Sequence, residues 1–211
     1  MDWLFYVVRG PLGIFFKSIW RCWRAEGKEK VPEHKVIIAA NHVSKADPAI
    51  IMSHFWRPVR YLAKEELFES KITAFFYRSI GQIPVGRGKS DRVAFKAAID
   101  SLNNGDRVGI FPEGTRVERK TRMRPHTGAV RLALLTDAQI IPCGISGSRE
   151  AFPRDKFPRF ANVGVEFGEP YVIERVKPAE EYSYDELQEL SNELLYDRIM
   201  PLVKEKSSAS P

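Results

Sequence analysis

The sequence predicts an α/β fold with a mixed, mostly parallel sheet flanked by helices. From residue 35 onward, short apolar runs typical of buried strands alternate with segments whose apolar residues recur at helical spacing. The chain has 211 residues, 44% hydrophobic and 28% charged, which suits one sizeable core and excludes a disordered protein. We expect an amino-terminal helical segment over residues 1–30, a folded domain over 31–205 and a disordered tail over 206–211.

The amino-terminal segment is apolar and aromatic over residues 3–8 and 12–16, but residues 9–11 interrupt it. No run approaches the roughly 18 apolar residues that a transmembrane helix needs. A signal peptide is not expected, because no basic stretch precedes the apolar part and no small-residue cleavage site follows. The composition favours an interfacial membrane helix, and a helix packed on the protein's own core is the alternative. The residues concerned are Trp3, Phe5, Tyr6, Phe15, Phe16, Trp20 and Trp23, with Lys17, Arg21 and Arg24 among them.

Six strands are expected in the folded domain, with helices between them. One helix follows Ser90, with three apolar residues on one face and Gly105 past its end, and a second covers about 128–137. A third begins at Ser183, which forms a capping-box pattern with Glu186. The expected strands are 35–41, 59–63, 82–85, 107–111, 139–146 and 162–167.

The net charge of +6 favours acidic partners such as anionic lipid, a phosphorylated substrate, an acidic carrier protein or nucleic acid. Nucleic acid is not the expected partner, because the aromatic residues gather at the amino terminus and not on a basic face. The short basic run at 119–124 suits lipid head groups or acyl carrier protein equally well. Cys22 and Cys143 lie far apart and lack metal-ligand spacing, so neither a disulfide framework nor a zinc site is expected.

The string Asn-His-Val-Ser-Lys-Ala-Asp-Pro at 41–48 directly follows the first expected strand. It places His42 five residues before Asp47. Five residues on a helix turn through about 140°, so the two side chains can meet only across a strand-to-helix turn. Asp47-Pro48 predicts such a turn, with Asp47 as N-cap and Pro48 as the first helical residue. A neutral imidazole held by a carboxylate can act as a general base. The alternative is that Asp47 merely caps the helix and His42 is a satisfied core residue.

Two further strings end expected strands. Phe-Pro-Glu-Gly-Thr-Arg at 111–116 places Glu113 and Arg116 where open α/β sheets bind ligands. The alternative is a polar turn with a surface ion pair between those two residues. Residues 81–87 end in Arg87, whose planar guanidinium can hold two phosphate oxygens, although such an arginine is often only a solvated charge.

Together these strings resemble the glycerophospholipid acyltransferases over roughly residues 35–170. His42 and Asp47 match the family's His-x-x-x-x-Asp motif, residues 81–87 its second block, 111–116 its third and Ile141-Pro142 its fourth. Lesser matches are residues 63–68 and 168–170. The chain departs from the family at Lys45-Ala46, where an aromatic or aliphatic pair is usual, and at His126, where a lysine is common.

The resemblance implies transfer of a fatty acyl group from acyl-CoA or acyl carrier protein to the sn-2 hydroxyl of lysophosphatidate, giving phosphatidate. His42 would be the base and Asp47 would fix its ring. Arg87 and Arg116 would hold the acceptor phosphate, and Glu113 would orient an arginine or a glycerol hydroxyl. The other implied substrate contacts are Gly114, Thr115 and, more weakly, Lys64. No metal or redox cofactor is implied.

The expected partners are therefore lysophosphatidic acid, an acyl thioester and the membrane surface, with acyl carrier protein as a further candidate. The expected location is the cytoplasmic face of the membrane, with peripheral or monotopic attachment. One alternative is an acyltransferase for another lysophospholipid or an amino-lipid, which would share the catalytic pair. Another is a non-enzymatic peripheral protein that binds lipid through its basic surface and aromatic segment.

Overall fold

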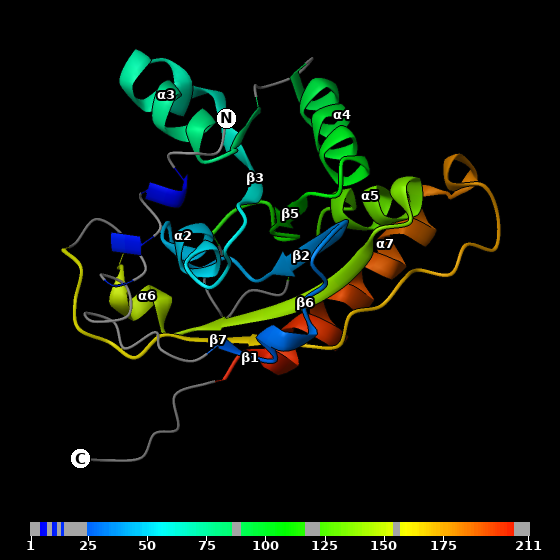
Figure 1. Cartoon of the computed structure of the whole chain (residues 1–211). Helices are drawn as coiled ribbons and strands as arrows, with labels where there is room; N and C mark the ends of the chain where they lie inside the picture. Colours follow the sequence, from blue (N-terminus) through cyan, green and yellow to red (C-terminus); the bar gives the residue numbers. More distant parts are fainter. Residues whose placement is uncertain are drawn as a thin grey trace.

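The computed structural model describes residues 5–7, 10–11, 14, 25–85, 90–116, 123–153 and 157–204. Its described part contains a seven-stranded sheet in the order β1-β7-β6-β2-β5-β3-β4 (Figure 1). Only β6 and β7 pair antiparallel, which confirms the mixed, mostly parallel sheet. The strands are β1 (Ala25–Glu26), β2 (Val36–Ala40), β3 (Val59–Lys64), β4 (Ile83–Val85), β5 (Arg107–Ile110), β6 (Gln139–Ser146) and β7 (Gly164–Phe167).

All six expected strands are present. The additional strand β1 has two residues, too few to produce a recognisable pattern, and it pairs with β7. The helices are α2 (Asp47–Met52), α3 (Lys71–Ser79), α4 (Ser90–Asn103), α5 (Gly128–Thr136), α6 (Ser148–Ala151) and α7 (Tyr184–Asn192), which continues as helical turns over Glu193–Ile199. Short 3₁₀ turns cover Lys28–Lys30, Glu65–Phe68, Ala179–Glu181 and Met200–Leu202.

The predicted capping box at the start of α7 is confirmed. The Ser183 hydroxyl accepts a hydrogen bond from the Glu186 backbone N–H at 3.2 Å, and the Glu186 carboxylate accepts one from the Ser183 N–H at 2.8 Å. Two N–H groups that the helix leaves without a partner are thereby satisfied. The position of this helix start was therefore readable from local sequence.

The sheet separates two apolar cores, with β2 at its centre. Residues of β2 alternate between them: Ile38 packs with α2, whereas Ile37 and Ala39 pack with α4, α5 and α7. Every residue of β2 is buried. This explains why its sequence is a continuous apolar run, since a central parallel strand faces protein on both sides.

Most of the predicted interfacial segment lies outside the described residues, as do Cys22 and the predicted tail over 206–211. Of the residues described there, Phe5 is buried in the core beside α2, whereas Tyr6 and Val7 are more than half exposed. In the described part of the chain, no helix has the length and apolarity required to cross a bilayer. The interfacial role of the segment stays a prediction.

Candidate functional site

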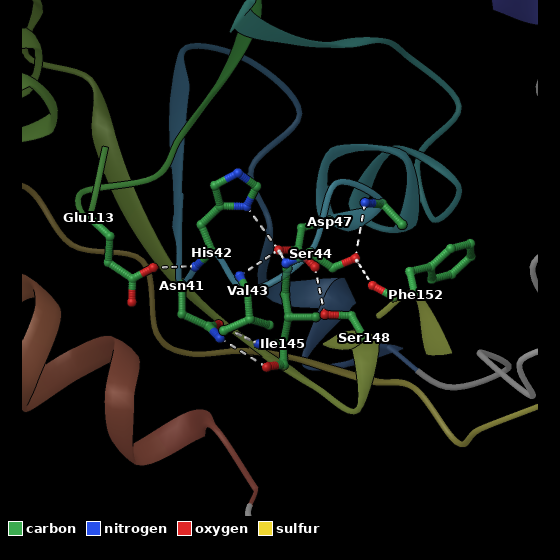
Figure 2. A network of polar contacts seen from close by, with 10 residues as sticks. Asn41, His42, Val43, Ser44, Asp47, Glu113, Ile145, Ser148 and Phe152 are labelled. Atoms are coloured by element: carbon green, nitrogen blue, oxygen red, sulfur yellow. Dashed lines mark hydrogen bonds and ion pairs between the residues drawn. The ribbon is translucent and has the colours of Figure 1, made fainter. Parts of the chain in front are cut away.

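The register of the central strands brings the two main motifs together. Strands β2 and β5 run parallel with Ala39 opposite Ile110, and His42 and Glu113 each lie three residues beyond that pair. The backbone N–H of His42 donates a hydrogen bond to Oε2 of Glu113 at 2.6 Å (Figure 2). Two strings that are 71 residues apart in the sequence thus form one site at the carboxyl edge of the sheet.

His42 and Asp47 form the expected pair across the strand-to-helix turn. Nδ1 of the ring lies 2.9 Å from Oδ2 of Asp47. An ionised carboxylate can only accept hydrogen bonds, so Nδ1 carries the proton and Nε2 is left as an acceptor. The His42 side chain is 17% exposed and that of Asp47 is fully buried. The arrangement suits a base whose reactive nitrogen is reachable from outside.

Asp47 does not cap α2, which corrects the expected N-cap. Ala46 occupies the N-cap position and Asp47 is the first helical residue. Its carboxylate turns back to the loop, where Oδ2 accepts hydrogen bonds from the backbone N–H groups of Val43 at 2.8 Å and Ser44 at 2.7 Å. The reason is that these two N–H groups, one buried and one partly buried, require an acceptor, and Asp47 supplies it while it also holds His42.

The second oxygen of Asp47 has a partner that sequence reasoning missed. The Ser148 hydroxyl, at the start of α6, donates to Oδ1 at 2.6 Å (Figure 2). Ser148 follows β6, the parallel neighbour of β2, so it emerges at the same edge of the sheet. The available signal was a hydroxyl just past the end of an expected strand. Whether that hydroxyl lies near Asp47 depends on the order of strands in the sheet, which the sequence does not give.

Asn41 ties the same two segments together. Its side-chain amide donates to the carbonyl of Ile145 at 3.0 Å and accepts from the Ile145 N–H at 2.7 Å. The last backbone pair between β2 and β6 is Ala40 opposite Cys143, so the Asn41 side chain continues the ladder beyond it. The residue before His42 is therefore fixed to the neighbouring strand.

Aromatic rings hold the His42 ring from one side. Phe111 stacks on it with ring centres 4.1 Å apart and an angle of 18° between the planes. Tyr61 stacks in turn on Phe111 at 5.4 Å and 15°. The Tyr61 ring fits over Gly109, where a Cβ atom would lie 2.2 Å from it. The stack covers one face of the imidazole and restricts its rotation.

Glu113 is buried, which overturns the alternative of a polar turn with a surface ion pair. Within the described ranges, no ion pair joins it to Arg116. Burial raises the pKa of Glu113 to about 7; the hydrogen bond from the His42 backbone opposes the rise and the nearby charge of Asp47 adds to it. The first partner of Glu113 is thus the main chain of the proposed base, not an arginine.

The rest of the 111–116 string is at the surface: Gly114, Thr115 and Arg116 are exposed. Gly114 has a positive φ of 65°, and a Cβ atom there would lie 2.3 Å from Cδ2 of His126. The positive φ favours glycine at this position independently of any ligand, and a side chain there would also have to displace the exposed His126 ring. His126, where the chain departs from the family pattern, lies against this turn, and its backbone N–H donates to the carbonyl of Pro112 at 2.7 Å.

Of the two remaining implied substrate contacts, Lys64 and Arg87, the fold locates only the backbone of Lys64. Lys64 is the last residue of β3, opposite Val85 at the end of β4, but its side chain is outside the described residues. Arg87 is also outside them. Strands β3 and β4 run parallel to β2 and β5, so Lys64 ends its strand at the same edge as the His42 site. A role for either residue stays a prediction.

Comparison with known proteins gives a match to the family model "Acyltransferase" over residues 22–146, more than half of the chain. The chain is 31% identical over 134 residues to the 1-acyl-sn-glycerol-3-phosphate acyltransferase of Bacillus subtilis, covering 61% of this chain and 66% of that one. It is 25% identical over 130 residues to the lyso-ornithine lipid O-acyltransferase of Pseudomonas aeruginosa, covering 61% of this chain and 50% of that protein. The chain thus spans between half and two thirds of these relatives.

The crystal structure of the 1-acyl-sn-glycerophosphate (LPA) acyltransferase from Thermotoga maritima matches with a TM-score of 0.68 and 23% identity. The match covers 90% of this chain and 77% of that chain. At this identity the likeness concerns the fold, and it agrees with the α/β architecture described above.

Proposed function

Because the chain belongs to the acyltransferase family, we propose that it transfers a fatty acyl group from a thioester to the sn-2 hydroxyl of 1-acyl-glycerol-3-phosphate, giving phosphatidic acid. The thioester is acyl-CoA or acyl carrier protein. The observation that carries the proposal is the His42 ring, whose Nδ1 is held 2.9 Å from a buried carboxylate. This leaves Nε2 to take a proton from an alcohol.

In the proposed mechanism, Nε2 of His42 removes the acceptor's hydroxyl proton as the oxygen attacks the thioester carbonyl. Asp47 stabilises the imidazolium that forms. When the tetrahedral intermediate collapses, the carbon–sulfur bond breaks, and Nε2 gives the proton that it took from the acceptor to the departing thiolate. The chemistry needs no covalent acyl-enzyme.

The choice of lysophosphatidate as acceptor is supported by two features. The first is the printed activity of the Bacillus relative. The second is the exposed Arg116, three residues after the Glu113 that contacts His42. Arginine suits a phosphate monoester because its planar fork bonds two oxygens at once. We assign Arg116, with Arg87, to the acceptor phosphate, and Thr115 and Lys64 to further substrate contacts.

The test is thiol release from palmitoyl-CoA by the purified protein, with and without lysophosphatidate, for the wild type, His42→Ala and His34→Ala. His34 is a matched control: it precedes β2, at the opposite end of the strand from His42, and its Nδ1 lies 3.0 Å from an Arg57 nitrogen. We expect His42→Ala to lower kcat on the order of 100- to 10,000-fold and His34→Ala to retain full activity. An active His42→Ala variant would remove His42 as the base.

Parallel reactions with lysophosphatidylcholine and with a lyso-ornithine lipid identify the acceptor. The second is included because a lyso-ornithine lipid O-acyltransferase is among the relatives. His42-dependent release with one of these in place of lysophosphatidate would keep the mechanism and change the substrate. Failure of palmitoyl-CoA with every acceptor calls for palmitoyl acyl carrier protein as donor, and failure there as well would favour a non-enzymatic lipid-binding role.

A further inference from the structure

We propose that Ser148 is a positioning residue of this site: its hydroxyl holds the Asp47 carboxylate so that Oδ2 faces the His42 ring. The inference rests on the proposed role of His42 as the base. None of the motif strings contains Ser148, which is 101 residues away from Asp47 in the sequence.

The contact has the geometry of a strong, charge-assisted hydrogen bond. The Ser148 Oγ lies 2.6 Å from Oδ1 of Asp47, and both side chains are fully buried. Among the described residues, Ser148 is the one hydrogen-bond donor found for Oδ1. The three donors to Oδ2 are Nδ1 of His42 and two backbone N–H groups of the loop. Ser148 therefore controls the rotation of the carboxylate from the opposite oxygen.

The position of Ser148 is itself well determined. The preceding Gly147 has a φ of 76°, and a Cβ atom there would lie 2.0 Å from the Asn162 carbonyl oxygen. Three residues earlier in the chain than Ser148, Ile145 is bound on both its N–H and its carbonyl by the Asn41 side chain. The segment that carries Ser148 is thus tied to the loop that carries His42, so its hydroxyl can orient Asp47 accurately.

The consequence concerns the tautomer of His42. A correctly oriented carboxylate accepts a hydrogen bond from Nδ1–H, which keeps the ring proton on Nδ1 and leaves Nε2 without one. Without the Ser148 hydroxyl, Oδ1 is a buried charged acceptor with no donor, and the carboxylate gains by rotating toward another one. The Nδ1–H···Oδ2 bond then weakens, and a share of the neutral rings carries the proton on Nε2. In those molecules Nε2 cannot act as a base.

The first test is independent of activity: nitrogen-15 NMR of the histidine rings at a pH where they are neutral. His42→Ala assigns the His42 signals. The matched control for Ser148→Ala is Ser191→Ala, which also removes a fully buried hydroxyl, but one that donates to the Leu187 carbonyl within α7 at 2.7 Å. We expect the Nδ1–H tautomer to dominate in the wild type and in Ser191→Ala, and a mixture of tautomers in Ser148→Ala.

The second test is kinetic. We expect Ser148→Ala to lower kcat on the order of tenfold, as loss of an orienting partner commonly does, with KM for donor and acceptor unchanged. A wild-type tautomer ratio in a folded Ser148→Ala variant would overturn the proposal, and so would equal losses of kcat in Ser148→Ala and Ser191→Ala. If Ser148→Ala does not fold, Ser148→Cys replaces it, because a thiol of similar size is a weaker donor; an unchanged tautomer ratio there overturns the proposal too.

The two tests separate this inference from the proposed function. If the wild type is inactive with every acceptor and donor, the function fails while the tautomer measurement still decides the role of Ser148. If the wild type is active and the tautomer does not respond to Ser148, the function stands and the positioning role falls.

Discussion

Glu113 shows how one buried carboxyl group links chemistry to stability at the residue scale. It accepts the His42 N–H at 2.6 Å, yet it is buried near the charge of Asp47. Burial raises its pKa to about 7, from an ordinary value of 4.5. The folded protein therefore binds a proton on Glu113 more tightly than the unfolded chain does, and the stability that this contributes is present below pH 4.5 and lost as pH rises through 7.

We predict that Glu113→Gln does not lose stability in this way as the pH rises, because its side chain cannot ionise and keeps an oxygen acceptor for the His42 N–H. Relative to the wild type, the variant should gain stability between pH 5 and pH 8, on the order of 2–3 kcal/mol. Urea unfolding of both proteins at the two pH values measures the difference, in which the other titrating groups cancel. Parallel pH profiles for the two proteins would show that Glu113 is charged throughout this range.

At the scale of elements, the site depends on the junction of β2 and β6. The ladder of backbone bonds between them stops at Ala40 and Cys143, where β2 gives way to the loop of His42. The Asn41 side chain supplies the next two hydrogen bonds of the ladder, to the N–H and carbonyl of Ile145. The Asn41 side chain thus lets the backbone of β2 leave the sheet while the N–H and carbonyl of Ile145 on β6 keep hydrogen-bond partners.

We predict that Asn41→Ala destabilises the fold by about 2–4 kcal/mol, because the N–H and carbonyl of Ile145 both lose their partner in a buried position. Thermal or urea unfolding measures the loss. Activity should fall as well, since the loop before His42 is released. The matched control is Asn103→Ala, at the exposed end of α4, for which we expect a change below about 0.5 kcal/mol. Equal stability of the two variants would contradict the role of Asn41.

At the scale of the whole molecule, the proposed lipid substrates require the site to lie close to a membrane surface. The basic balance of the chain favours an anionic surface. The expected anchor is the amino-terminal segment, and removal of residues 1–24 should reduce liposome binding more than turnover of a detergent-dispersed acceptor. The structure refines this experiment, because Phe5 is part of a core and its deletion would also disturb the fold.

A sharper test replaces exposed residues and leaves Phe5 in place. We predict that the double variant Tyr6→Ser/Val7→Ser binds phosphatidylglycerol-containing vesicles about tenfold more weakly, because it loses apolar area that would enter the interface. Vesicle sedimentation measures this. The control is Val176→Ser, which removes an even more exposed valine, from the chain between β7 and α7. Unchanged binding by the double variant would rule out these two residues as part of the anchor.

The fold class, the six main strands and the start of α7 were predictable from the sequence, because they depend on local signals. A buried parallel strand needs a continuous apolar run, and a helix start needs a side chain to satisfy its free N–H groups. The expected meeting of His42 and Asp47 across a turn was equally local, since five residues separate them. The N-cap assigned to Asp47 was wrong. A carboxylate between a loop and a helix can accept hydrogen bonds from the N–H groups of either one, and the sequence does not show which of them it binds.

What tertiary structure alone decided is which distant residues share the site. The sequence marked polar residues at the ends of several strands, but strand order placed Glu113 beside His42 and Ser148 behind Asp47. It also buried Glu113 and made its carboxylate the acceptor of the His42 N–H, a contact that the sequence did not indicate. The physical reason is that hydrogen bonding and burial act through space: residues 71 and 101 positions apart become neighbours only when β5 and β6 flank β2.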